Sequence, residues 1–178
     1  MKSLLVVILF LSFLSVSAQQ EFPILAKNSF EFINAANDRK IEDVYINSNN
    51  KVVVIYPNDE KKKYDKDEVW GYRNRKGIAY RLYERKEYEI RQMEGIIIYE
   101  TPVTAIVGEL IYNDKKYYFS NGPDEPVYKL NYENLEKAFA DNPTFLEIIK
   151  QKFKNKDLWR HKDSSFEIVQ AYNEAIKK

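Results

Sequence analysis

The feature of this sequence that most constrains its fold is a series of short β-prone segments between residues 41 and 120, joined by turns of a few polar residues. Each segment is rich in β-branched or aromatic side chains, which favour strands. Connections such as "SNN", "NRKG" and "NDKK" can join only antiparallel neighbours, because a parallel crossover needs a dozen or more residues. The segments span residues 41–47, 51–56, 68–73, 78–84, 87–92, 95–100, 104–112 and 116–120.

Turns that recur at intervals of roughly 8–12 residues favour a meander over alternating βαβ units. The sequence therefore predicts an antiparallel meander of about six to eight strands, shaped as a curled sheet, a roll or a barrel. Within the segment 87–92, alternation places Tyr88 and Ile90 opposite the charged Glu89, so this strand is expected to have one solvated face. Gly71 has no side chain to pack and predicts a bulge or a close backbone approach.

The periodicity changes after the proline-rich stretch "NGPDEPVYK" (121–129), which cannot continue a ladder. Asn131 is a predicted N-cap, because its side chain can accept a hydrogen bond from the first helical turn. Asn142 followed by Pro143 predicts a second helix, with proline at its first position.

A third helix is predicted near the C-terminus, where Ser164 and Glu167 have capping-box spacing. The fold class is therefore α+β, an antiparallel meander followed by about three C-terminal helices over residues 131–178. The segment 22–40 is compatible with two structures, because "SFEFINAAND" could be a short helix capped by Ser29 or a first strand with alternating Phe30 and Phe32.

The N-terminus has the three-part pattern of a secretory signal peptide. Lys2 supplies a positive start, residues 4–14 are almost all apolar, and small side chains precede a predicted cut after Ala18. The apolar run is too short to span a bilayer, which takes about 18–20 residues, so no membrane span is expected. We expect a signal peptide over 1–18 and a single globular domain over 19–178, periplasmic or secreted. The chain has no cysteine, which excludes a lipid anchor on a cysteine and favours a bacterial envelope protein.

Several quoted stretches carry a resemblance. Over residues 68–149, "VWGYRNRKG", "EYEI", "GIIIYE", "YYFSNGPDEPVYKL" and "NLEKAFADNPTF" resemble small exported proteins of Bacteroidota-type bacteria that have no assigned activity. The resemblance implies export and a sheet followed by helices. It transfers no functional residue, because the family itself is uncharacterised.

The charges and the few reactive side chains argue against several function classes. The 28 basic and 27 acidic residues become balanced once Lys2 is removed, so the positive charge of a nucleic-acid binder is missing. The one basic run, Lys61–Lys63, lies among acidic residues and is expected to be a solvated turn. With no cysteine, one histidine and no spaced calcium-loop motif, we expect neither a metal nor a cofactor.

The catalytic inventory is also small. His161 lies only three residues before Ser164, too close to act as its base, and is expected to be a solvated loop residue. Glu109 in "IVGELIY" is the acid of most interest, because apolar neighbours would leave it either paired or perturbed. Its predicted partner is Arg81, and the alternative is a catalytic acid. No catalytic residue is assigned.

The fourteen tyrosines are the remaining candidates for function, because a tyrosine ring combines an apolar body with a polar tip. Alternation places Trp70 and Tyr72 on one face, where core packing is favoured over ligand binding. Tyr83 shares a face with Arg81, and for this pair core packing and an exposed ligand-binding position are equally compatible with the sequence. The candidate ligand- or partner-binding residues are Trp70, Tyr72, Arg81, Tyr83, Tyr117 and Tyr118.

The expected function is that of an exported, non-enzymatic binding module of the cell envelope. Its ligand would be an unknown partner protein or a small apolar or aromatic molecule. One alternative is a carboxylate-dependent hydrolase of envelope glycans, with Glu109 as one acid. A third is a secreted protease inhibitor that presents the loop 121–128, stiffened by Pro123 and Pro126.

Overall fold

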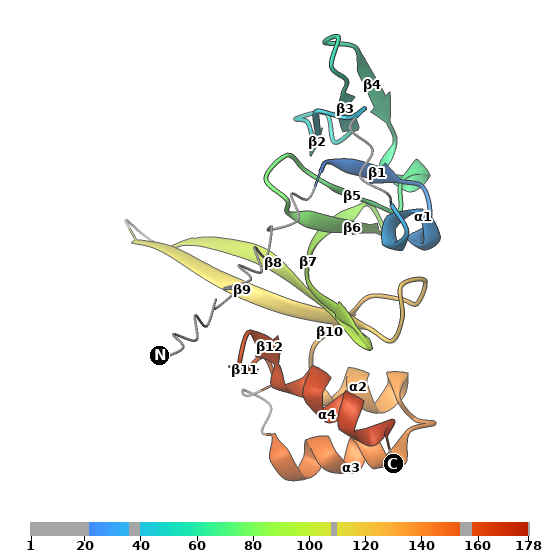
Figure 1. The fold of residues 1–178 in the computed structure, drawn as a ribbon. Helices are drawn as coiled ribbons and strands as arrows, with labels where there is room; N and C mark the ends of the chain where they lie inside the picture. The colour runs from blue at the N-terminus through green and yellow to red at the C-terminus, as the bar shows by residue number, and fades with distance from the viewer. Residues whose placement is uncertain (1–21, 36–39, 108–109, 154–157, 178) are drawn as a thin grey trace, which may run out of the picture.

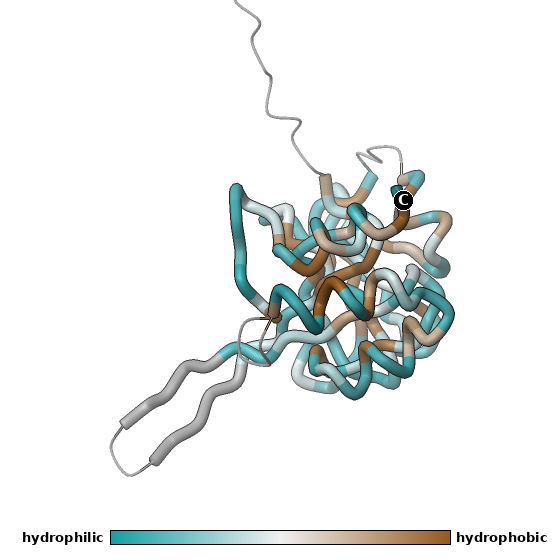
Figure 2. The backbone as a smooth tube through the Cα atoms, turned by 90° about the horizontal axis from the view of Figure 1, so that it is seen from below, coloured by the Kyte–Doolittle hydropathy of each residue, from teal (hydrophilic) through white to brown (hydrophobic). Residues whose placement is uncertain are grey.

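The computed structural model describes residues 22–35, 40–107, 110–153 and 158–177. It is an α+β structure in which antiparallel strands form three sheets and helices gather near the C-terminus (Figure 1). In Figure 2, hydrophobic segments lie towards the middle of the body and hydrophilic turns at its periphery. The expected fold class is therefore confirmed.

The largest sheet has seven strands in the order β1-β5-β6-β7-β8-β9-β10. From β5 to β10 each strand pairs with the next one in sequence, so this part is the predicted antiparallel meander. Its strands are β1 (Ile24–Ala26), β5 (Gly71–Arg73), β6 (Ala79–Tyr83), β7 (Lys86–Glu94), β8 (Ile96–Val107), β9 (Leu110–Ser120) and β10 (Tyr128–Lys129).

This sheet is open, and the prediction of a curled sheet, roll or barrel is wrong. Its two edge strands, β1 and β10, have only three and two residues and do not pair with each other. The apolar faces are instead covered by the helices, by a smaller sheet and by the loop 121–127. Closure is unnecessary because other elements bury these faces.

The smaller sheet contains β2 (Asp43–Ile46), β3 (Val52–Ile55) and β4 (Lys61–Tyr64), joined by short turns. Val44, Val52 and Val54 are fully buried in a cluster with Tyr72 and Leu82 of the large sheet. The expectation of a turn at the lysine run is wrong, because these lysines form β4. Their side chains are exposed, as suits an edge strand protected by charge.

In the N-terminal segment the helix alternative is confirmed, whereas a strand with alternating Phe30 and Phe32 is wrong, because the first strand lies earlier in the chain. Residues of β1 pair with β5, and α1 (Ser29–Ile33) follows directly. The N-cap is Asn28 rather than Ser29, since the Asn28 side chain accepts a hydrogen bond from the Glu31 amide at 2.8 Å. Phe32 points inward from α1 and lies 5.0 Å from the Trp70 ring.

Two of the three predicted helices begin where expected. The helix α2 (Tyr132–Ala138) is capped by Asn131, and α3 (Pro143–Lys152) is capped by Asn142. Each asparagine side chain accepts a backbone hydrogen bond at 2.9–3.0 Å. Their apolar faces bury the outer part of the large sheet, in a cluster that includes Ile96, Ile98, Phe119, Leu135, Phe139, Phe145 and Ile149.

The third helix differs from the prediction. Ser164 does not cap it, because residues 161–166 form the hairpin of β11 (His161–Lys162) and β12 (Ser165–Phe166). Asp163 and Ser164 both have positive φ, as a two-residue hairpin turn requires. The helix α4 (Glu167–Ala175) starts after this hairpin and has no side-chain cap.

The two faces of the large sheet are covered by different elements. The Arg81 face, which carries Arg81, Tyr88 and Tyr99, lies beneath α1 and the loop 121–127. The Tyr72 face lies beneath the small sheet at one end and beneath the C-terminal helices at the other. Between these two covers, Arg91 forms ion pairs with Glu89 and Glu100.

Candidate functional site

A gap in the sheet arises because β7 is longer than β6. Pairing between the two strands ends at Tyr80 opposite Glu89, whereas β7 continues to pair with β8 as far as Glu94. Residues 90–94 therefore have no β6 partner along one edge. The chain leaves β5 through the turn 74–77 and does not fill this space.

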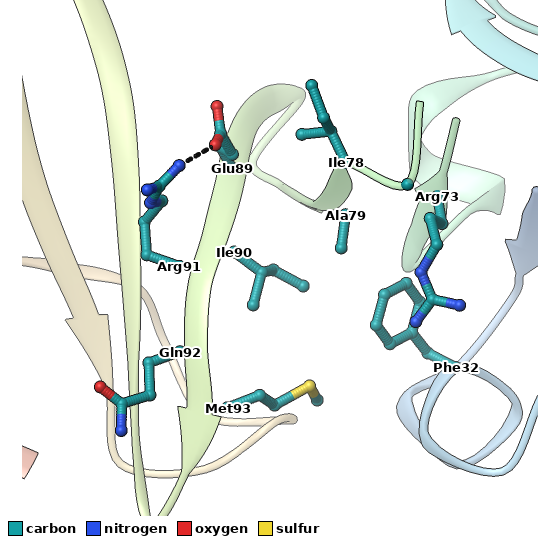
Figure 3. A pocket seen from close by; sticks show the side chains of 10 residues that line it. Phe32, Arg73, Ile78, Ala79, Glu89, Ile90, Arg91, Gln92 and Met93 are labelled. Carbon is teal, nitrogen blue, oxygen red and sulfur yellow. Dashed lines mark hydrogen bonds and ion pairs between the residues drawn. The ribbon is translucent and has the colours of Figure 1, made fainter. Parts of the chain in front are cut away.

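The gap is the floor of a groove, which we call the β7 groove (Figure 3). It comprises two hollows of about 420 and 280 Å³ that share Phe32, Arg73 and Met93 as lining residues. Its other lining residues include Ile33, Ile78 and Ile90.

The walls of the β7 groove combine apolar and charged side chains. Ile90 and Met93 project from β7 across the gap towards Phe32 of α1 (Figure 3). The Arg73 guanidinium lies over the Phe32 ring, 5.9 Å from its centroid. A ligand in this groove would meet apolar side chains on one side, a strand edge on the other and an arginine at the rim.

The charged residues beside the groove are paired with one another. Arg91 donates a hydrogen bond to Glu89 at 2.5 Å, and this bond raises the pKa of the arginine. Glu89 and Glu100 are cross-strand partners, and Lys115 lies 3.0 Å from Glu100. Cations flank both carboxylates, so the arrangement is an ion-pair network and does not resemble a pair of catalytic acids.

Three of the predicted site residues lie together on the Arg81 face. The Arg81 guanidinium lies 5.4 Å from the Trp70 ring and 5.3 Å from the Tyr83 ring. Arg81 is only 3% exposed. From the sequence, a core position and an exposed position beside Tyr83 were equally compatible with strand alternation. It donates hydrogen bonds to the hydroxyl groups of Tyr99 and Ser120. The group therefore holds the sheet together from within.

The predicted pairing of Trp70 with Tyr72 on one face is wrong. Tyr72 is buried on the opposite face, where it stacks on Tyr80 with ring centroids 5.0 Å apart. Trp70 precedes the first residue of β5, Gly71, so strand alternation does not extend to it. Its ring packs on Phe32 instead.

The two adjacent tyrosines of β9 face opposite sides, as predicted. Tyr117 packs beneath the C-terminal elements, near Trp159 and Phe166. Tyr118 lies on the Arg81 face, 5.0 Å from the Tyr88 ring. Neither residue lines the β7 groove, so the structure does not bring the six candidates into one site.

The loop 121–127 is held down on the Arg81 face at several points. Trp70 Nε1 donates to the Pro123 carbonyl at 3.0 Å, and Arg81 donates to the Glu125 carbonyl at 2.8 Å. The Ser29 hydroxyl donates to the Asp124 carboxylate at 2.8 Å. These contacts connect the loop to α1, β6 and the start of β5.

Sequence reasoning did not identify Phe32, Arg73, Ile90 and Met93 as a site. Ile90 and Met93 are ordinary strand residues. The segment that contains Phe32 was compatible with either a helix or a strand. The groove depends on the relative lengths of β6 and β7 and on the position of α1. The sequence contains no signal for this difference in length, because the expected segments 78–84 and 87–92 are of similar length.

Other predicted groups have structural surroundings or lie elsewhere. Glu109 lies outside the described residues. His161 is exposed in β11, and its ring packs 3.9 Å from the Phe166 ring. Within the described ranges, no group of three or more His, Cys, Asp or Glu side chains is placed to hold a metal ion. None of the helices in those ranges is long and apolar enough to cross a membrane.

No protein-family model matches the chain, and comparison with curated proteins and with solved structures likewise gives no match. The resemblance to exported Bacteroidota-type proteins therefore stays a prediction.

Proposed function

We propose that this chain is an exported binding protein of the cell envelope that holds an extended segment of a partner polypeptide in the β7 groove. The observation that carries the proposal is the unpartnered edge of β7, residues 90–94, beside a groove that has apolar side chains along one wall. The signal-peptide pattern of residues 1–18 supports the exported location.

A strand edge is suited to an extended peptide. Its backbone amide and carbonyl groups alternate along the edge and can form a ladder with an added strand. Five residues of β7 span roughly 17 Å, which is enough to pair with a short peptide strand. Side chains of the added strand would alternate between the apolar wall formed by Phe32 and Met93 and the opposite, charged side near Arg91.

Two observations favour binding over the alternatives considered from the sequence. Glu89, which lines the groove, and its cross-strand partner Glu100 are engaged with cations. The loop 121–127 is attached to the sheet through Trp70, Arg81 and Ser29, whereas an inhibitory loop has to project into a protease. Peptide binding in the β7 groove requires neither a free carboxylate nor a projecting loop.

The experiment is a selection of random displayed peptides against the processed chain, recovered after export of the full sequence. We expect enriched peptides with strand-forming, alternating apolar residues. The matched variants are Ile33→Asp, at the groove, and Ile176→Asp, on the far side of the helices. The two isoleucines are 57% and 58% exposed, so neither substitution should unfold the protein.

Ile33→Asp is expected to weaken the enriched peptide by about tenfold, while Ile176→Asp leaves binding unchanged. Methylation of alternate backbone amides of the peptide should abolish binding without altering its side chains, because it removes ladder donors. Failure to enrich any peptide, or equal binding to both variants, would contradict the proposal.

A further inference from the structure

A second hollow, of about 310 Å³, lies beside the β6–β7 turn and is separate from the β7 groove. We call it the Lys66 hollow. Its walls include Lys66, Trp70 and Tyr83, and charged residues of the turn, together with Lys27 just after β1, surround its rim. None of its lining residues lines the β7 groove.

Lys66 is an unusual residue for such a position. It lies in the short 3₁₀ helix η1 (Lys66–Glu68) and is only 8% exposed. Among the described residues, its ammonium group has one hydrogen-bond partner, the Arg85 carbonyl oxygen at 3.2 Å. An ammonium group has three donors, and a buried cation is stable only when it is well paired. Lys66 therefore has donor capacity for an anion.

A second buried cation contacts two of the residues that line the hollow. Arg81 contacts the Trp70 and Tyr83 rings, and in the described part of the chain it bonds to hydroxyl and carbonyl groups but to no carboxylate. Its Nε atom is buried and has no hydrogen-bond partner there. The positive charge of Arg81 is consequently not neutralised locally and adds to that of Lys66.

The charged residues of the rim balance one another, so the net positive charge of the lining comes from Lys66. Lys27 and Arg85 line the hollow, and Arg85 forms an exposed ion pair with Asp67 at 3.0 Å. The remaining carboxylate of the rim, Glu84, is exposed in the turn. The aromatic walls complete the site, because Trp70 and Tyr83 are half-buried and offer flat apolar surface next to the cations.

We infer that the Lys66 hollow binds a small organic anion. The anionic group, a carboxylate or a phosphate, contacts the Lys66 ammonium, and a flat apolar ring rests against Trp70 and Tyr83. The inference rests on residues distinct from the β7 groove, so it stands or falls independently of the proposed peptide binding.

The test uses the fluorescence of Trp70. The chain has two tryptophans, and Trp159→Phe leaves Trp70 as the sole reporter. Titration with benzoate or phenyl phosphate is expected to change its emission saturably, whereas benzyl alcohol, which has the ring without the charge, is not. The better of the two anions identifies the group that the site prefers.

Lys66→Met is expected to weaken anion binding by about tenfold, because it removes a charged hydrogen bond while retaining the apolar stem. Lys62→Met, an exposed lysine of β4, is the matched control and should change nothing. Glu84→Gln should tighten binding by roughly twofold by removing a like charge at the rim, an effect that a purely structural role would not produce. The inference is overturned if neither anion binds, if benzyl alcohol binds as well as benzoate, or if Lys66→Met binds like the parent.

Discussion

Among single residues, Arg81 shows how this protein keeps a charge in its interior. The guanidinium is surrounded by Trp70, Tyr83 and Tyr99 and bonds to neutral oxygens on β8, β9 and the loop 121–127. A planar group with five donors can reach several strands at once, which lysine cannot do. One side chain thus connects the middle of the sheet to the loop that covers it.

Gly71 lies where the backbones of β5 and β6 approach each other closely, and a substitution there tests this approach. A Cβ atom at this position would lie 2.4 Å from the carbonyl oxygen of Tyr80, and a backbone atom cannot easily move away. We expect Gly71→Ala to lower the free energy of unfolding by about 2–3 kcal/mol. Urea denaturation measures this change, and a variant as stable as the parent would show that the two strands are further apart than described.

Tyr72 gives the stability a pH dependence. Burial, together with the hydrogen bond to Glu87 and its charge, raises the pKa of Tyr72 far above its ordinary value of about 10. Burial also raises the pKa of Tyr80 and of Tyr88. Above pH 10 the unfolded chain loses phenolic protons that the folded chain keeps, so stability falls as the pH rises through this range.

The expected slope is at most about 1.4 kcal/mol per pH unit for each such tyrosine. Tyr72→Phe removes one titrating group, so its unfolding free energy should fall less steeply between pH 10 and 12. Denaturant titrations at a series of pH values measure the two slopes. Equal slopes for parent and variant would contradict the assigned burial of the Tyr72 hydroxyl.

Within regular strands, alternation correctly predicted the face of the sheet to which a side chain points. At strand ends this prediction failed. Tyr117 and Tyr118 face opposite sides because both lie within β9. Trp70 departs from the pattern because β5 begins only at Gly71. The burial of Arg81 was also missed, since its partners come from distant segments whose positions no local pattern reveals.

At the scale of elements, the relative lengths of neighbouring strands decide where the protein is open. The β6 and β7 strands pair with each other from the tight turn that joins them. Away from this turn β7 extends beyond the last paired residue of β6, and the unpaired part of β7 forms the edge of the groove. The same turn contributes Glu84 and Arg85 to the Lys66 hollow. One hairpin therefore borders both proposed binding sites.

That hairpin turn offers a test of local strain. Glu84 and Arg85 have φ angles of 48° and 61°, the left-handed region that asparagine and glycine occupy with less strain. The double substitution Glu84→Asn and Arg85→Gly should raise the free energy of unfolding by about 1 kcal/mol, because it relieves this strain. A thermal or urea unfolding curve measures the gain, and a loss of stability would mean that the exposed Arg85–Asp67 ion pair outweighs the strain.

Helix caps were predictable where the cap residue acts through its own side chain. Asn131 and Asn142 both cap the helices that follow them. Ser164 had equally good spacing, but it forms a turn between β11 and β12, and Phe166 packs into the core from the second of these strands. Tertiary burial of one aromatic residue thus outweighed a local capping signal worth about 1 kcal/mol.

At the scale of the whole molecule, the meander and its helical cover were predictable, but the open shape was not. Turn spacing fixes which strands are neighbours and leaves undetermined whether the first and last strands meet. The three-stranded sheet packs against Tyr72 and Leu82 and buries a surface that a closed barrel would have turned inward. The β7 groove is likewise a consequence of assembly and has no motif of its own.

Export is the property of the whole chain that its N-terminus predicts. Expression of the full sequence in an exporting bacterial host should yield a protein that lacks residues 1–18 and begins at Gln19. Intact mass and N-terminal sequencing of the envelope fraction measure this directly. Recovery of the uncut precursor in the cytoplasmic fraction would contradict the proposed location.

The central claim is that residues 90–94 of β7 accept an added strand, and amide hydrogen exchange tests it most directly. The processed chain is measured alone and with its most strongly enriched peptide. The account predicts that those amides of 90–94 that face the open edge exchange at least about tenfold more slowly in the complex, while those of β3, remote from the groove, are unchanged. Unchanged exchange at 90–94 in a saturated complex, or protection confined to another part of the sheet, would contradict it.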